Sequence, residues 1–217
     1  MRTFGFPEFL FILEAAKWTL ALSAIAFVGG AILGLIIALM RTSESTWARA
    51  VSTTFIQIFQ GTPLLLQLFL VFFGAPVLGL DINPWVAAGV ALILNSAAFL
   101  GEIWRGCIEA IPRGQWEAAE ALSLKYSSRM RDVVLPQAFK IALAPTVGYV
   151  VQIIKGTSLA AIIGFVEVTR AGQIVNNATF QPLIVFSVVA AIYFVICWPL
   201  SILASRMERR RAQALAR

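Results

Sequence analysis

Nine polar side chains interrupt stretches of sequence that are built mostly of Leu, Ile, Val, Ala and Phe. They combine neutral hydrogen-bonding groups with one ammonium and one carboxylate: Thr62, Gln67, Asn95, Ser96, Glu102, Gln152, Lys155, Thr157 and Ser158. Polar groups in such surroundings are costly, and they usually face the interior of a helix bundle or a water-filled path. We therefore take these nine residues as a candidate path for a polar solute.

Enzymatic chemistry is not expected from this chain. It contains no His, which removes the Ser-His-Asp set and the commonest metal ligand. No G-x-x-x-x-G-K-[ST] loop for nucleotide phosphates occurs, and "KGTS" at Lys155–Ser158 lies in an apolar run rather than after a strand. Cys107 and Cys197 are too far apart in sequence to suggest a disulfide framework or a metal cluster. We expect no catalytic residue, no metal and no cofactor bound by the chain.

The composition is that of a membrane protein. Of the 217 residues, 59% are hydrophobic and 13% are charged, whereas soluble domains carry roughly twice that charged fraction. A helix needs ~20 mostly apolar residues to cross the hydrocarbon core. After the connections are subtracted, this length leaves room for about five spans. We expect an all-α membrane protein that forms a single transmembrane domain over residues 1–217.

Five apolar runs predict the membrane spans. They cover residues 19–40, 53–75, 84–104, 139–163 and 182–204. The residues before the first run lack a small-residue cleavage pattern, so we interpret them as an interfacial segment and not as a removed signal peptide. In the first run, Ala26, Gly30 and Gly34 recur every four positions, which favours close helix packing in lipid.

Two of the predicted spans contain irregular sequence. Gly61 and Pro63 weaken the helical hydrogen bonding of the second span, so Gly61–Pro63 is interpreted as a kink or hinge. The fourth span is interrupted at Lys155–Ser158, where Gly156 permits an irregular backbone. Such breaks persist at membrane depth only where protein or water satisfies the freed backbone groups. Both segments are therefore predicted to face protein or water.

The distribution of Lys and Arg predicts the orientation, because basic residues are retained on the cytoplasmic side. The basic connections hold Arg41, Arg49, Arg105, Arg113, Lys125, Arg129, Arg131 and Lys140, and the tail holds Arg206, Arg209, Arg210, Arg211 and Arg217. The opposite connections hold only Arg170. We predict that the amino terminus lies outside and the carboxy terminus in the cytoplasm. The net charge of +6 is then mostly a topology signal and not a nucleic-acid patch.

The predicted cytoplasmic connection of residues 105–138 is the most polar part of the chain. Apolar residues recur at steps of three to five residues from Ile108 to Leu122, which predicts a short helix followed by an amphipathic one at the membrane surface. The polar run "KYSSRMRD" follows. On these residues alone, a solvated connector held by anionic lipid is an equally good interpretation.

This connection carries a resemblance to a known family. Glu117, Ala118 and Ala119, followed by a spacer that ends in Val133-x-Leu135-Pro136, resemble the EAA loop of bacterial ABC-importer permeases. "GTPLLLQLF" from Gly61, "GEIWRG" from Gly101, "IPRGQWEAA" from Ile111, "LPQAFKIALAP" and "KGTSLAAIIG" are similar to the polar amino-acid branch, in its usual order. Ser123 departs from the family, which usually has Gly at that position.

The resemblance implies a type I importer permease in the bacterial cytoplasmic (inner) membrane, which works by alternating access. In that family the loop docks into a cytoplasmic ATPase and couples it to the permease. The residues expected to form this coupling loop are Glu117, Ala118, Ala119, Ser123, Arg129, Leu135 and Pro136. It implies two copies of an ATPase that binds ATP and Mg, a second permease chain, identical or homologous, and a periplasmic or lipid-anchored solute-binding protein. The expected substrate is a polar amino acid. Membrane lipid is the expected surrounding, and no nucleic-acid partner is expected.

An amino-acid substrate carries a carboxylate and an ammonium, so its path needs donors and acceptors together. Lys155 could meet the carboxylate, directly or through the exposed amides of the broken helix. Glu102 or Asn95 could meet the ammonium. The alternatives are a snorkelling Lys155, a Glu102–Arg105 salt bridge, and interhelical hydrogen bonds for Gln67 and Asn95.

Other functions remain open on the sequence. A permease of the same architecture could carry a quaternary amine or an organosulfur compound. A secondary transporter or channel would need no ATPase, but five spans cannot contain an inverted pair of equal repeats. A structural scaffold would leave the polar residues of the spans without a role.

Overall fold

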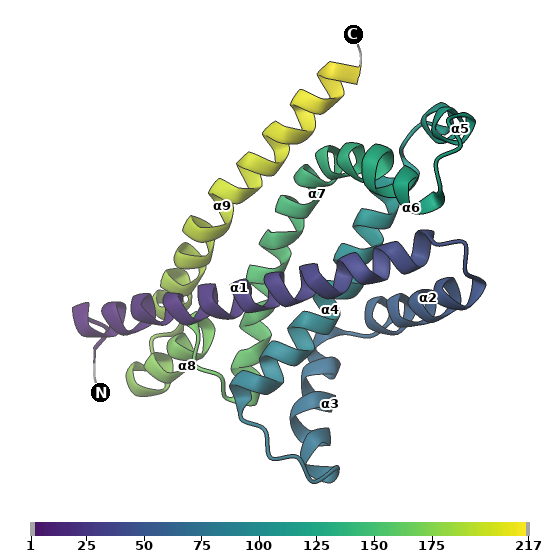
Figure 1. Cartoon of the computed structure of the whole chain (residues 1–217). Helices are drawn as coiled ribbons and strands as arrows, with labels where there is room; N and C mark the ends of the chain where they lie inside the picture. The colour runs from purple at the N-terminus through teal and green to yellow at the C-terminus, as the bar shows by residue number, and fades with distance from the viewer. Residues whose placement is uncertain (1–2, 216–217) are drawn as a thin grey trace.

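Helices account for all the regular structure between residues 3 and 215, which are the residues that the computed structural model describes (Figure 1). In chain order they are α1 (Phe6–Thr42), α2 (Thr46–Gly61), α3 (Leu64–Val77), α4 (Pro84–Glu109), α5 (Arg113–Ala121), α6 (Tyr126–Ser128), a π-helical turn (Arg129–Val134), α7 (Leu135–Gly156), a 3₁₀ helix (Thr157–Ile163), α8 (Val168–Thr179) and α9 (Pro182–Leu215). The expected all-α fold is confirmed.

Four helical stretches of the described residues are each long and apolar enough to cross a bilayer: Phe6–Thr42, Pro84–Glu109, Tyr126–Ile163 and Pro182–Arg210. The second span was predicted as one kinked helix, but the structure has two separate helices there. It consists of α2 and α3, which are bent by 101° at Thr62 and Pro63. Pro63 has no N–H to donate, so the helical ladder ends before it and α3 starts in a new direction. The count is five if this bent pair forms one span.

The first helix is longer than the expected span at residues 19–40. It begins at Phe6, where Pro7 occupies the first turn and the Glu8 carboxylate accepts a hydrogen bond from the Gly5 amide at 3.1 Å. Its first turns pack Ile12 and Ala15 against an apolar cluster of α8 and α9. The segment expected to be an interfacial lead-in is therefore continuous with the first helix, because it has its own apolar packing partner.

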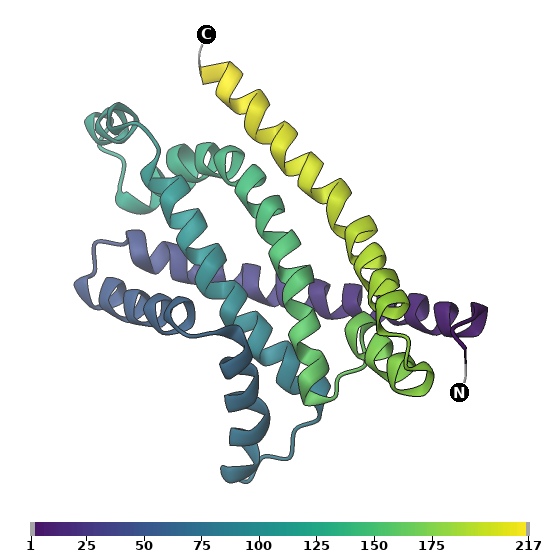
Figure 2. The same ribbon diagram turned by 180° about the vertical axis from the view of Figure 1, so that it is seen from behind.

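The remaining α1 packs most extensively on α4, and it crosses α4 and α7 on one side of the bundle (Figures 1 and 2). The contact depends on small residues. A Cβ atom added to Gly30 would lie 2.5 Å from Ser96 Cβ, and one added to Gly34 would lie 3.1 Å from Ala97 O. The close packing predicted for this stripe of small residues is confirmed.

The central apolar cluster joins five parts of the chain. It contains Leu22 of α1, Leu68 of α3, Leu92 of α4, Ile153 of α7 and Ile163 of the 3₁₀ helix. Because Leu68 and Leu92 are almost fully buried, this cluster fixes α3 against α4 below the bend. It thereby holds the two irregular segments, Gly61–Pro63 and Lys155–Ser158, in one region of the bundle.

The predicted connection of residues 105–138 is shorter in the structure. α4 continues to Glu109 and α7 already begins at Leu135, so residues 110–134 form what we call the α5–α6 segment. The interruption expected at "KGTS" is a change from α-helix to 3₁₀ helix after Gly156. The last helix runs past the expected end at residue 204. Arg217, one of the basic residues of the predicted cytoplasmic tail, lies outside the described residues.

Candidate functional site

The α5–α6 segment stands apart from the long helices at one end of the bundle (Figure 1). Ile111 is buried in a cluster that also contains Ile108, Met130 and Val134, and Trp116 of α5 packs against this cluster. This cluster anchors the segment on the ends of α4 and α7. Tyr126 Oη donates a hydrogen bond of 2.7 Å to Thr42 O, which ties the segment to the end of α1 as well.

One face of α5 remains uncovered. Glu117, Ala118 and Leu122 are exposed, whereas Ala119 is buried. Glu120 pairs with Arg129 at 3.1 Å across the turn between α5 and α6. The two residues of the motif that are exposed therefore share a helix whose orientation is fixed by the cluster and by an ion pair. Such a face is available to a partner protein.

Ser123 adopts the left-handed conformation that glycine favours, with φ of 57°. The Ser123 amide donates to Glu120 O at 2.7 Å and the Leu124 amide donates to Ala119 O at 3.2 Å. These two bonds form a Schellman motif that ends α5. The turn usual for Gly in the family is thus present with a Ser, and the two backbone bonds hold it.

A buried amide network joins the bend between α2 and α3 to α4. Gln67 Nε2 donates to Phe59 O at 2.8 Å and to Thr62 O at 3.0 Å, which are carbonyls near the bend. Asn95 Nδ2 donates to Gln67 Oε1 at 3.1 Å. The hydroxyl of Tyr149 on α7 lies 3.5 Å from Asn95 Oδ1. Gln67 and Asn95 therefore hydrogen-bond between helices and satisfy the backbone that the bend exposes.

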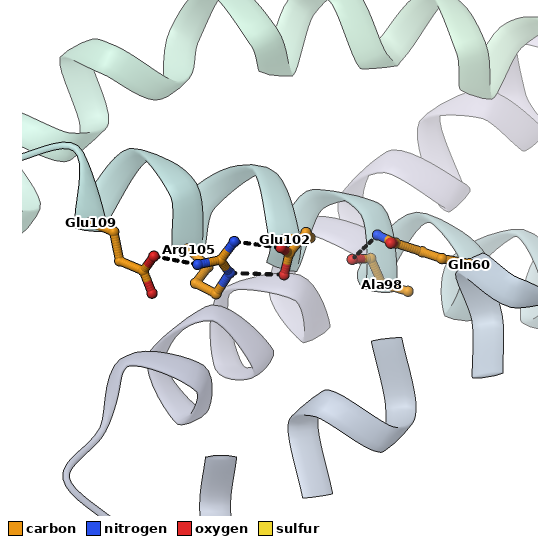
Figure 3. A network of polar contacts seen from close by, with 5 residues as sticks. All are labelled: Gln60, Ala98, Glu102, Arg105 and Glu109. Carbon is orange, nitrogen blue, oxygen red and sulfur yellow. Dashed lines mark hydrogen bonds and ion pairs between the residues drawn. The ribbon is translucent and has the colours of Figure 1, made fainter. Parts of the chain in front are cut away.

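A row of polar side chains follows one face of α4 from its middle to its end (Figure 3). The Arg105 guanidinium donates to both carboxylate oxygens of Glu102, at 2.9 and 2.5 Å, and to Glu109. One helical turn or more before Glu102, Ala98 O accepts a hydrogen bond of 3.3 Å from Gln60 Nε2 of α2. The expected Glu102–Arg105 ion pair is present, and Glu109 makes it a triad.

The other predicted path residues differ in exposure. Gln152 and Lys155 of α7 are exposed, and no described residue forms an ion pair with Lys155. Thr157 is buried and donates to Ile154 O, and Ser158 donates to Lys155 O, both at 2.7 Å. Ser96 is buried against Gly30. The hydroxyls thus stabilise the change of helix type, whereas the amide and the ammonium are available to a ligand.

A buried carboxylate that no sequence pattern predicted, Glu167, caps α8. The Glu167 side chain is 0% exposed and accepts hydrogen bonds from the Arg170 amide at 2.9 Å and from Tyr193 Oη at 2.6 Å. Thr19 Oγ1 of α1 lies 3.5 Å away. Burial raises the pKa of the Glu167 carboxyl, while hydrogen bonds from Thr169, Tyr193 and Arg170 act in the opposite direction. The cluster joins α1, α8 and α9.

The model of one protein family matches residues 30–213, which is most of the chain and includes the α5–α6 segment. That family is described as the binding-protein-dependent transport system inner membrane component. The chain belongs to this family. It is therefore a multi-pass protein of the inner membrane and a subunit of a transport system.

Two relatives with named transport functions match nearly the full length of this chain. The glutamine transport system permease protein GlnP of Escherichia coli (strain K12) is 36% identical over 206 residues, with 94% of each chain covered. The arginine transport system permease protein ArtQ of Bacillus subtilis (strain 168) is 37% identical over 205 residues, with the same coverage.

A solved structure gives the same picture for the fold. A chain from the crystal structure of an amino acid ABC transporter with histidines superposes with a TM-score of 0.87 at 34% identity, over 96% of this chain and 100% of that chain. The arrangement of α1 to α9 is thus that of an ABC importer membrane subunit. The expected fold and family are confirmed.

Proposed function

We propose that the chain is the membrane subunit of an ATP-driven importer for a polar amino acid, and that the exposed face of α5 receives the motion of an ATPase. The observation that carries this proposal is the α5–α6 segment, whose buried face is anchored on α1, α4 and α7 while Glu117 and Ala118 remain exposed. A rigid body pressed against α5 would move the ends of three long helices together. The names of the relatives support the amino-acid substrate.

The proposal includes an orientation. The amino terminus lies outside, and the carboxy terminus and the α5–α6 segment lie in the cytoplasm, because the basic residues gather in the segment and in the tail. The five spans are α1, the bent α2–α3 pair, α4, α7 with its 3₁₀ extension, and α9. Two ATPase copies hold ATP and Mg. A second permease chain, identical or homologous, and a solute-binding protein complete the complex.

A reversal of charge on α5 tests the coupling. Glu117→Lys should insert normally but lose ATP-driven uptake, because an acidic group on the proposed docking face becomes basic. Glu44→Lys is the matched control, since Glu44 is an exposed residue in the turn between α1 and α2, at the end of α1 that Tyr126 contacts. Uptake of labelled amino acids into vesicles, compared at equal protein level, separates the two. Unchanged uptake by Glu117→Lys would refute the docking role.

The proposed solute path runs beside the two irregular segments and the polar row of α4. Lys155 is exposed there without an ion pair to a described residue, which suits a solute carboxylate. The Glu102 carboxylate retains acceptor capacity beside Arg105 and suits the ammonium. Gln67 and Asn95 position this region through their network, and Gln152 extends its polar lining from α7.

The removal of one positive charge tests the path. Lys155→Met should weaken the apparent affinity for the solute about tenfold or more, because a charge-assisted hydrogen bond contributes on the order of 1.5–3 kcal/mol. Lys125→Met, an exposed lysine of the α5–α6 segment, should leave that affinity unchanged. Equal apparent affinities for Lys155→Met and the parent chain at matched expression would show that Lys155 only extends to the membrane interface.

A further inference from the structure

A side groove lies between α1, α4 and α7, next to the α5–α6 segment. It has a volume of about 600 Å³, and its lining includes Ala31, Leu35, Trp104, Ala138, Phe139 and Ala142. The few polar groups in it are internally satisfied, since Trp104 Nε1 donates to Thr146 Oγ1 at 2.9 Å. An apolar cavity of this kind does not hold ordered water. Its occupant must therefore be apolar.

The groove opens toward the hydrocarbon of the bilayer. Leu35 is 44% exposed and Phe139 is 66% exposed, and both belong to helical stretches that are long and apolar enough to cross the membrane. A lipid chain can enter such an opening without leaving an apolar environment. The groove is too small to accommodate a transmembrane helix. With its side chains a helix is about 10–12 Å across, so a volume of about 600 Å³ would accommodate little more than one turn.

Positive charge surrounds the same end of the bundle. Four exposed basic residues of the α5–α6 segment and the start of α7 form no ion pair with a described residue: Arg113, Lys125, Arg131 and Lys140. Lys140 directly follows the exposed Phe139 of the groove. Basic residues at the cytoplasmic surface attract anionic lipid headgroups. The charge and the apolar lining together select an amphiphile with a negative head and a hydrocarbon tail.

We propose that this groove binds one acyl chain of an anionic phospholipid, with the headgroup at Lys140. The site is independent of which solute the protein carries. It adjoins the base of the α5–α6 segment, because Ile108, Leu135 and Ala138 line the groove and also belong to the apolar cluster that anchors α5. A bound chain therefore packs directly against that cluster and reduces the freedom of the segment to move away from α4 and α7.

Fluorescence quenching by brominated phospholipids tests the site, since Trp104 lies in the groove. The complete transporter is reconstituted in vesicles of phosphatidylcholine mixed with phosphatidylglycerol, and either lipid carries the brominated chains. The Trp104 signal is the difference between the parent and a Trp104→Phe variant. We expect brominated phosphatidylglycerol to quench it at a membrane fraction several-fold lower than brominated phosphatidylcholine does. Trp198, which is 54% exposed on α9, should show no such preference.

Two variants separate the headgroup from the chain. Lys140→Gln should reduce the preference for phosphatidylglycerol at Trp104 about fivefold, whereas Lys140→Arg should retain it. Ala142→Phe should fill the groove and protect Trp104 from both brominated lipids. Because Lys140 is exposed, its variants keep the test valid even if Ala142→Phe fails to fold.

Three outcomes would overturn the proposal. The first is that Trp104 is quenched equally by the two brominated lipids, and the second is that neither lipid quenches it. The third is that a cysteine introduced at Leu143, in the lining of the groove, forms a disulfide between two permease chains, since a second chain would then cover the groove.

Discussion

The Tyr193 hydroxyl donates a hydrogen bond of 2.6 Å to the carboxylate of Glu167, which is fully buried. Tyr193 belongs to α9 and Glu167 caps α8, so this bond closes the junction between the last two helices. The Val168 amide donates to Thr19 Oγ1 of α1 at 3.3 Å beside it. One carboxylate therefore holds three helices in register, far along the chain from the α5–α6 segment.

Loss of the tyrosine hydroxyl should destabilise this junction. Tyr193→Phe leaves the fully buried Glu167 carboxyl without its shortest hydrogen bond, and a buried acceptor left without a partner costs about 1–3 kcal/mol. Tyr126→Phe is the control, since it removes a bond of 2.7 Å to the neutral Thr42 carbonyl, which is worth about 1 kcal/mol. Thermal unfolding in detergent measures both. A smaller effect for Tyr193→Phe than for Tyr126→Phe would contradict the role of this bond in closing the junction.

The raised pKa of Glu167 predicts a pH dependence. Because burial raises the pKa above the ordinary value of 4.5, the folded state favours the protonated carboxyl. Its contribution to stability is full below pH 4.5 and is lost as the pH rises through the raised pKa. Glu167→Gln removes this titration. The stability of the parent relative to Glu167→Gln should therefore increase when the pH is lowered from neutral toward 4.5. If the stabilities of the parent chain and of Glu167→Gln changed with pH in parallel, the predicted titration of Glu167 would be disproved.

The left-handed turn at Ser123 should become more stable with glycine. An L-residue with positive φ carries a steric cost of about 1–2 kcal/mol, part of which glycine gives back through its larger freedom in the unfolded chain. We expect Ser123→Gly to slow hydrogen exchange at the Ser123 and Leu124 amides, which close the Schellman motif. Ser127→Gly, within α6, should instead destabilise its turn by a few tenths of a kcal/mol. Faster hydrogen exchange at these two amides in Ser123→Gly would contradict the proposed backbone strain at Ser123.

The packing of α1 on α4 should not tolerate a methyl group at Gly30. Its Cβ would lie 2.5 Å from Ser96 Cβ, so Gly30→Ala must push the helices apart at a cost of about 1–3 kcal/mol. The control is Gly74→Ala in α3, where an added Cβ meets nothing within 4 Å. That variant should gain about 0.5–1 kcal/mol, since alanine favours the helix. Thermal unfolding compares the two, and equal midpoints would argue against close packing at Gly30.

Much of the architecture followed from the sequence because the length of an apolar run is a local property that predicts a membrane-spanning helix. The small residues of α1 predicted a close helix contact, and the structure places them on α4. The angle between α2 and α3 could not be predicted, because Gly61 and Pro63 weaken a helix without fixing its new direction. That direction depends on the Gln67 amide of α3, which binds the freed carbonyls, and on Asn95 of α4, which donates to Gln67.

The candidate site was predictable only in part, for the same reason. Glu102 and Arg105 are three residues apart on one helix, so their ion pair could be expected, and the structure contains it. Glu167 was missed because it lies in a connection between apolar runs, where a carboxylate is usually solvated. Its partners Thr19 and Tyr193 are 148 and 26 residues away, and no local pattern links them to it.

The bend of 101° between α2 and α3 has a consequence for biogenesis. The two helices contain 16 and 14 residues, or about 24 and 21 Å at ~1.5 Å per residue, and each is shorter than a hydrocarbon core of ~30 Å. Neither can insert stably as an independent hairpin partner for α1. The carbonyls of Phe59 and Thr62 find their amide donor within α3, but Gln67 is itself fixed by Asn95 of α4. We therefore expect the second span to adopt its native bend only when α4 is also in the membrane.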